Sequence, residues 1–334
     1  PADERESLFG PADWQAMDRP QSMAKLINWT LTDLMATHPE LVVAGEDVGR
    51  KGGVYGVTKR LQTRFGPRRV IDTLLDEQSI LGLAIGLAHN GFVPIPEIQF
   101  LAYYQNAQDQ IRGEAATLPF FSEGRFTNPL VLRIASLGYQ RGFGGHFHND
   151  NSIAVLRDVP GLIVACPSNG RDASLMLREA VRLARAEQRV VAFLEPIALY
   201  GTTDLHEAGD GEWASSYPEP GSAAIDLGQV GVQGSGDDVA IVTYGNGTHL
   251  ATQAMRILAE DHDVGARVID IRWLAPLPVD AIAEACGSYA RVLVVDECRQ
   301  TGSLSEQLVT ELAERGIHAG RLCAADSFIA TGPA

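Results

Sequence analysis

Short apolar segments alternate with helical segments along this chain, and that alternation limits the folds it can adopt. Apolar runs stand at residues 130–134, 162–165 and 190–194, with a helical pattern at 173–186. Short apolar runs separated by helices are typical of a parallel, doubly wound sheet. A second alternating series begins at Asp238. We therefore expect an α/β fold with two doubly wound domains.

Residues 201–225 interrupt the alternation with Gly, Pro, Ser and acidic residues, a composition typical of a linker. The chain has 334 residues, which is enough for two cores. The predicted boundaries are an N-terminal arm or linker at 1–21, a first domain at 22–200, an interdomain linker at 201–225 and a second domain at 226–334. Gly209-Asp-Gly211 resembles the start of a metal–diphosphate motif, but no strand and helix flank it, so we interpret it as a turn.

Charge and cysteine usage argue against several classes of function. The formal net charge is −15 without a basic patch, which disfavours nucleic acid or an anionic membrane as a partner. No apolar run is long enough to span a bilayer, and the N-terminus lacks the pattern of a signal peptide. The four cysteines show no zinc-binding spacing, so we expect no metal site and reduced thiols in a cytoplasmic protein.

Two histidines stand close together in a glycine-rich segment at 141–151 that follows an apolar run. His146 and His148 are two residues apart, and an extended backbone with that spacing projects both imidazoles to one side. The neighbouring glycines allow sharp turns and close approach of a ligand. Two nearby histidines can equally be surface or structural groups, so the spacing alone leaves both interpretations open.

A carboxylate, Glu77, stands where an apolar helical segment at 79–88 begins. The helix dipole favours a negative charge there, and the simplest interpretation is an N-terminal helix charge. A glycine-rich loop also follows the apolar run 41–44. It could bind phosphate, but it matches neither the GxGxxG nor the P-loop spacing.

Several motifs in a fixed order resemble those of one enzyme family. They are Val43-Ala-Gly-Glu-Asp-Val-Gly-Arg, Gly53-Val-Tyr-Gly-Val-Thr-Lys59, Asp72-Thr-Leu-Leu-Asp-Glu77, Pro96-Glu-Ile-Gln-Phe100, His148 before Pro160-Gly-Leu, Phe193-Leu-Glu-Pro196, and Ile269-Asp-Ile-Arg-Trp-Leu-Ala-Pro-Leu277. From about residue 22 to 334, the chain resembles the β subunit of thiamine-diphosphate-dependent 2-oxoacid dehydrogenase E1 components, relatives of transketolase. Gly144-Gly-His-Phe-His-Asn-Asp-Asn looks most like the β-like half of fused E1 proteins, so we expect a separate subunit or part of a fused chain.

The resemblance implies a pyrimidine-binding thiamine diphosphate fold followed by a transketolase C-terminal-like domain. It implies that Glu77 hydrogen-bonds N1′ of the aminopyrimidine ring, which favours the tautomer that removes the thiazolium C2 proton. Tyr103 falls where the family has an aromatic ring, usually Phe, on the pyrimidine, and its hydroxyl needs a partner. Gln99 is implied as a wall of the cofactor site.

The same resemblance assigns His148 as the active-site histidine that handles substrate and acyl transfer, with His146 as second choice. A metal–diphosphate motif is missing from this sequence. The resemblance therefore implies that an α subunit or α-like half holds Mg²⁺ and the diphosphate, most simply as α2β2. Residues 182–188 lack the Asp-rich turn that binds K⁺ in some relatives, which makes K⁺ doubtful.

The function implied by the resemblance is oxidative decarboxylation of a 2-oxoacid, of pyruvate or branched-chain type, with acyl transfer to a lipoyl-bearing E2. One alternative is a transketolase-like or acyloin-forming carboligase that passes the same intermediate to an aldehyde. Another is a non-catalytic scaffold subunit. The presence of both Glu77 and His148 argues against the scaffold.

Overall fold

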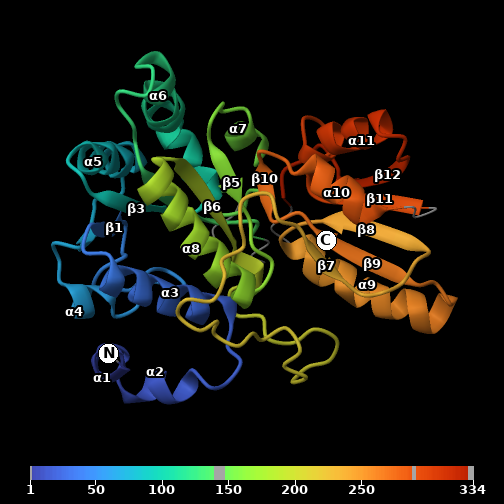
Figure 1. Ribbon diagram of the computed structural model, residues 1–334, viewed down its shortest axis with the longest axis horizontal. Helices are drawn as coiled ribbons and strands as arrows, with labels where there is room; N and C mark the ends of the chain where they lie inside the picture. The colour runs from blue at the N-terminus through green and yellow to red at the C-terminus, as the bar shows by residue number, and fades with distance from the viewer. Residues whose placement is uncertain (1, 139–146, 288–290, 330–334) are drawn as a thin grey trace.

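Two mainly parallel sheets form the frame of the molecule, as the alternation of strands and helices predicts. The structure is a computed structural model, and it describes residues 2–138, 147–287 and 291–329. The two sheets lie beside each other, and helices pack on each of them (Figure 1). The predicted α/β class with two doubly wound parts is confirmed. No helix among the described residues is long and apolar enough to cross a membrane.

The first sheet has seven strands within the described residues, in the order β10-β5-β6-β4-β3-β1-β2. Their bounds are Leu41–Gly45 (β1), Val70–Asp72 (β2), Val93–Ile98 (β3), Leu130–Ser136 (β4), Ile163–Ala165 (β5), Val190–Pro196 (β6) and Trp273–Ala275 (β10). Neighbouring strands are parallel except β10, which is antiparallel to β5. β1, β3, β4 and β6 are buried along their whole length, as strands covered on both faces are.

Helices cover the two faces of this sheet. They are Met23–Thr37 (α3), Leu61–Phe65 (α4), Glu77–His89 (α5), Leu101–Ala107 (η1, a 3₁₀ helix), Gln110–Ala116 (η2, a π-helix), Thr117–Phe121 (α6), Ala154–Arg157 (α7), Gly170–Glu187 (α8) and Ile197–Leu199 (η4). α3 packs on α8, whereas α5 packs on β3 and η1. A Cβ at Gly170 would come within 2.8 Å of Leu26 Cδ1, so the close contact of α3 and α8 requires glycine there.

The second sheet has the order β12-β11-β8-β9-β7 within the described residues. Its strands are Gly231–Gln233 (β7), Val239–Thr243 (β8), Ala266–Asp270 (β9), Arg291–Arg299 (β11) and Ala319–Ala324 (β12), with helices Asn246–His262 (α9), Val279–Cys286 (α10) and Leu304–Glu314 (α11). All neighbours are parallel except β7, which is antiparallel to β9. This arrangement matches the second alternating series of the sequence.

The two parts share one hydrophobic core. A single cluster of buried side chains includes Ile80 and Leu194 from the first part and Tyr244 and Leu308 from the second. β10 strengthens this connection, because residues 273–275 follow β9 in the chain and yet form an edge of the first sheet. A strand at residues 273–275 was not among the elements expected from the sequence.

The N-terminal segment, predicted as an arm or linker at 1–21, contains helical turns. Ala2–Phe9 (α1) and Pro11–Ala16 (α2) are two short helices, and Phe9 is fully buried. Arg64 Nη2 donates to the Phe9 carbonyl at 3.2 Å and to Asp13 Oδ2 at 2.8 Å. Asp13 also accepts from Lys25 Nζ. These polar contacts hold α1 and α2 against the rest of the chain, and the sparse apolar pattern of residues 1–21 did not predict them.

A buried ion network joins three strands of the first sheet. Arg133 on β4 donates to Glu195 on β6 at 2.7 and 2.8 Å, and to Glu97 on β3 at 2.5 Å. The Tyr200 hydroxyl also donates to Glu195, at 2.5 Å. Burial opposes the charge of Arg133, but Glu195 and Glu97 together raise its pKa. Burial raises the pKa of Glu97, and the nearby guanidinium opposes that rise. Each charge is therefore compensated only while its partners are in place.

Replacing Arg133 with Met should lower the free energy of unfolding by about 3–5 kcal/mol, because two buried carboxylates lose their cation. Urea unfolding followed by circular dichroism measures this change. Arg125→Met is the matched control, since Arg125 pairs with Glu123 on the surface and its side chain is 77% exposed. Equal midpoints for the two variants would contradict the importance of the buried network.

Candidate functional site

The carboxyl ends of three parallel strands meet at one edge of the first sheet. Gly45 at the end of β1 pairs with Asp72 of β2 and with Glu97 of β3. The chain beyond these strands contains Glu46, Glu77 and the segment from Gln99 onward. Ligands of open α/β sheets bind outside the carboxyl ends of the strands, so this edge is the natural place for a site.

Glu77 is the first residue of α5 and is half-buried. The N-terminus of a helix stabilises a carboxylate there. Asn106 Nδ2, from η1, donates to Glu77 Oε2 at 3.2 Å. A second carboxylate, Glu46, lies near enough to be affected by its charge. The pKa of Glu46 is raised, first by burial and then by the charges of Asp47 and Glu77.

Aromatic side chains surround His148 on the neighbouring part of this edge. The Tyr103 hydroxyl lies 3.2 Å from His148 Nε2, so a hydrogen bond joins η1 to the loop that carries the histidine. The Phe100 ring is 4.5 Å from the imidazole, centroid to centroid, and nearly perpendicular to it. Burial, followed by the charges of Glu46 and Glu77, raises the pKa of Tyr103. The tyrosine therefore contacts the histidine and is near enough to both carboxylates to be affected by their charges.

The residues predicted from the sequence fall into three groups. Glu77, Tyr103 and His148 lie at one edge of the sheet, connected as described above. Gln99 directly follows β3 and is partly buried. His146 lies outside the described residues, so its place as second candidate stays a prediction.

Sequence reasoning missed two members of this group. Glu46 appeared only within a family motif and the glycine-rich loop after residues 41–44, although its place directly after β1 is the signal that could have found it. Phe100 appeared as the last residue of a family motif. It is buried, and it also packs against His148.

The triplet Gly209-Asp-Gly211 is a turn, as predicted. Asp210 accepts hydrogen bonds from the backbone N–H groups of residues 205, 206, 207 and 212, at 2.7–2.9 Å. These contacts lower its pKa. Among the described residues there is also no group of three or more His, Cys, Asp or Glu side chains that could hold a metal ion.

Glu77→Gln should lower the pKa of Glu46, because it removes a nearby negative charge that disfavours ionisation. Burial and Asp47 should still keep that pKa above its ordinary value. Titration of ¹³C-labelled glutamate side chains by NMR measures the effect. Glu123→Gln on the surface is the control and should leave Glu46 unchanged. The proximity of the two carboxylates would be disproved by a Glu46 titration that does not move in Glu77→Gln.

Comparison with known proteins assigns both parts of the chain. The family described as "Transketolase, pyrimidine binding domain" matches residues 19–202, and "Transketolase, C-terminal domain" matches residues 228–333. Pyruvate dehydrogenase E1 component subunit beta of Staphylococcus aureus (strain Mu50 / ATCC 700699) is 34% identical over 317 residues, which cover 92% of this chain and 90% of the relative. 3-Methyl-2-oxobutanoate dehydrogenase subunit beta of Mycobacterium tuberculosis (strain CDC 1551 / Oshkosh) is 38% identical over 277 residues, which cover 83% and 74%.

A solved structure supports the fold. A chain titled "Split gene transketolase, inactive beta4 tetramer" superposes with a TM-score of 0.70, covering 93% of this chain and 91% of the other, at 19% identity. The family resemblance seen in the sequence motifs is therefore confirmed by independent comparisons. This chain belongs to the transketolase-like family of E1 β subunits of 2-oxoacid dehydrogenases.

Proposed function

We propose that this chain is the β component of a thiamine-diphosphate-dependent 2-oxoacid dehydrogenase, active together with an α partner. Its reaction is the oxidative decarboxylation of a 2-oxoacid of pyruvate or branched-chain type, with acyl transfer to a lipoyl-bearing E2. The names of its relatives support this reaction. The observation that carries the proposal is the position of Glu77, half-buried at the N-terminus of α5 and close to Tyr103.

The residues at this edge fit the aminopyrimidine ring of the cofactor. Glu77 offers a carboxylate that can accept a hydrogen bond from a ring nitrogen, and Asn106 already orients one of its oxygens. Tyr103 supplies an aromatic face, with its hydroxyl directed to His148. Gln99 forms part of the wall after β3. When bound, thiamine diphosphate supplies the carbanion equivalent that this reaction needs.

The proposed role of Glu77 is to hold a proton at N1′ of the pyrimidine. An ionised carboxylate next to that nitrogen favours its protonation, which shifts basicity to the exocyclic nitrogen on the same ring. Glu77 stands in the first turn of α5, where the helix dipole favours a negative charge. Burial, together with the charges of Asp47 and Glu77, raises the pKa of the second carboxylate, Glu46.

His148 is proposed to donate a hydrogen bond or a proton to the substrate and to the acyl group in transfer. Its Nε2 is paired with Tyr103, and its ring packs on Phe100, so its orientation is set by two neighbours from one segment. His146 is retained as the second candidate for the same role.

An α subunit or α-like half is proposed to hold the diphosphate and Mg²⁺. The triplet Gly209-Asp-Gly211 is not suited to that task, because Asp210 is occupied by backbone N–H groups of its own loop. The proposed assembly is α2β2, in which the cofactor lies between α and β chains. In that arrangement the half-exposed Glu77 is covered by the partner.

Glu77→Gln, assembled with the α partner, should slow C2 proton exchange of bound thiamine diphosphate by about 100-fold or more, since a positioned acid–base group contributes about 10²–10⁴-fold. Exchange into deuterated buffer followed by NMR measures it. Asp76→Asn is the matched control, because it removes the adjacent charge, which accepts a hydrogen bond from Ser79. Exchange at the wild-type rate in Glu77→Gln would refute the role of this carboxylate.

His148→Ala should reduce acyl transfer to the lipoyl domain more than decarboxylation. Carbon dioxide release with ferricyanide as acceptor reports the first half of the reaction, and acylation of an isolated lipoyl domain reports the second. His89→Ala, an exposed histidine on α5, serves as control. If the wild-type complex instead forms acyloin and does not acylate lipoyl groups, the carboligase alternative replaces the dehydrogenase.

A further inference from the structure

The loop that carries His148 is held at both ends by the second part of the chain. Residues 139–146 of this loop lie outside the described residues, but both flanking segments are described. On the first side stands Leu137, and on the second stands the segment 149–157. Polar contacts join each of them to α9, β11 or α11.

The first end of the loop is fixed by Asn246 at the start of α9. Asn246 Nδ2 donates to the Leu137 carbonyl at 2.9 Å and to Glu297 Oε2 at 2.9 Å. Leu137 has a φ of 51°, a left-handed conformation that costs energy in a leucine. A contact that holds its carbonyl helps to maintain this turn. The contact of Asn246 with Glu297 also joins the start of α9 to β11.

The second end is fixed by Arg299, the last residue of β11. Arg299 Nη1 donates to Ser152 Oγ at 2.5 Å, and Nη2 lies 3.2 Å from Asp150 Oδ1. Asp150 Oδ1 also accepts from the Asn151 backbone N–H at 2.9 Å and from Ser152 Oγ at 2.8 Å. The guanidinium is oriented from its other side by the Ser327 carbonyl, at 3.1 Å from Nε.

Two contacts of Asn151 extend this connection. Asn151 Nδ2 donates to the Glu297 carbonyl, and Cys298 Sγ lies 2.7 Å from the Asn151 carbonyl. Asn151 is 3% exposed, so these contacts are protected from water. Three consecutive residues, 150–152, are thus bound to three consecutive residues of β11, 297–299. A displacement of β11 would therefore be transmitted to the backbone two residues from His148.

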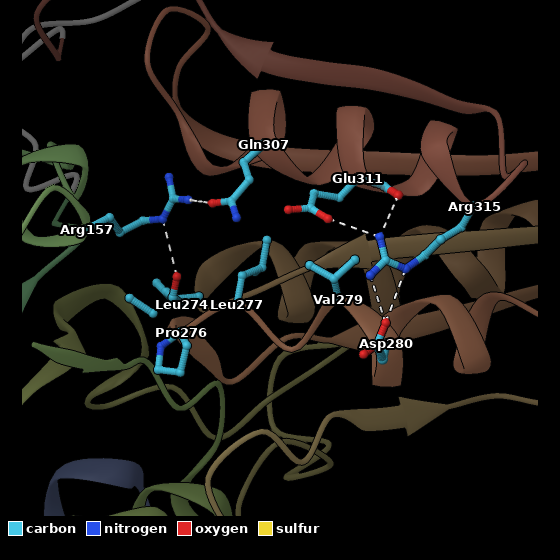
Figure 2. Close-up of a pocket in the computed structure, with 10 residues that line it drawn as sticks. Arg157, Leu274, Pro276, Leu277, Val279, Asp280, Gln307, Glu311 and Arg315 are labelled. Carbon is cyan, nitrogen blue, oxygen red and sulfur yellow. Dashed lines mark hydrogen bonds and ion pairs between the residues drawn. The ribbon is translucent and has the colours of Figure 1, made fainter. Parts of the chain in front are cut away.

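A third contact lies at the end of α7, a few residues further along the same segment. Arg157 Nε donates to the Leu274 carbonyl at 3.2 Å, and Nη2 donates to Gln307 on α11 (Figure 2). Both contacts line a cavity of about 430 Å³ between α7 and α11. On the opposite side of this cavity, Arg315 pairs with Asp280 at 2.8 Å and with Glu311 at 3.0 Å, all within the second part.

We propose that Arg299 is a positioning residue that, through Asp150 and Ser152, fixes the distance of His148 from the proposed reaction centre. This inference rests on the proposed function, because it gives a contact outside the candidate site a role in placing the histidine inside it. Tyr103 and Phe100 orient the imidazole ring, whereas Arg299 fixes the backbone that carries it. Displacement of a catalytic group by about 1 Å can cost up to about 100-fold in rate, so the second part of the chain contributes to catalysis without touching the substrate.

The alternative is that Arg299 only joins the two parts of the chain. Both roles predict some loss of stability on substitution, so stability alone cannot separate them. They differ in which step is affected. A positioning residue for His148 acts on acyl transfer and has no additional effect when His148 is absent. A structural contact acts equally on steps that depend on Glu77 and on His148.

The test uses the αβ complex with Arg299→Met, Arg299→Lys and Asp150→Asn, and with Arg315→Met as the matched control. Arg315→Met removes a guanidinium with two carboxylate partners that do not contact the His148 segment. Arg299→Met is expected to slow lipoyl acylation about 10- to 100-fold while C2 proton exchange stays within about twofold. Arg299→Lys should recover part of the loss, because its ammonium can replace one of the three guanidinium contacts, and Arg315→Met should leave both steps unchanged.

Two further measurements make the result decisive. Hydrogen exchange of the Ile153 amide, which donates to the Asn151 carbonyl at 2.9 Å, should accelerate in Arg299→Met and Asp150→Asn even in the β chain without cofactor. In a His148→Ala background, Arg299→Met should add no further loss of acylation. Equal losses in both steps, or additive losses with His148→Ala, would overturn the positioning role. Inactivity of the wild-type complex would instead refute the proposed function.

Discussion

A guanidinium buried between two carboxylates fixes the edge of the sheet on which the candidate site lies. Arg133 connects β3, β4 and β6 through Glu97 and Glu195, beneath the residues that follow these strands. Because Glu97 is the penultimate residue of β3, the contact also fixes the start of the segment with Phe100 and Tyr103. Removing a buried charge from its partners is costly, so this segment has little freedom to shift. The chemistry proposed for the site depends on that rigidity.

The candidate site combines groups held in two different ways. Glu77 is held by α5, the helix that it begins, at the edge of the first sheet where β1, β2 and β3 are neighbours. His148 belongs to a loop, whose ends are bound by Asn246 and Arg299 of the second part of the chain. Tyr103 bridges the two, since its hydroxyl contacts the histidine and its pKa responds to the carboxylates. In this chain the second part therefore supports the loop that carries His148.

Local patterns predicted much of the fold and part of the site. The apolar runs of β1, β4 and β6 and the alternation with helices were sufficient for the α/β class, because buried parallel strands leave a continuous apolar signature. The place of Glu77 before an apolar helix indicated only a helix charge, and its role in a site was implied by the family resemblance. The contact between Tyr103 and His148 spans 45 residues, and no periodicity encodes it. The three residues of β10 were likewise too few to predict, and their partner strand β5 belongs to the first part of the chain.

The position of β10 has a consequence for how such a protein can be divided. Residues 273–275 complete the edge of a sheet whose other strands all come before residue 197. A fragment ending in the loop at 201–225 would leave the β5 edge uncovered, and the complementary fragment would present the fully buried Trp273 to water. Recombination between homologous genes at that loop would give a folded protein only if β10 from one parent still paired with β5 from the other. One short antiparallel ladder between β10 and β5 therefore requires the two halves of the chain to remain compatible in sequence.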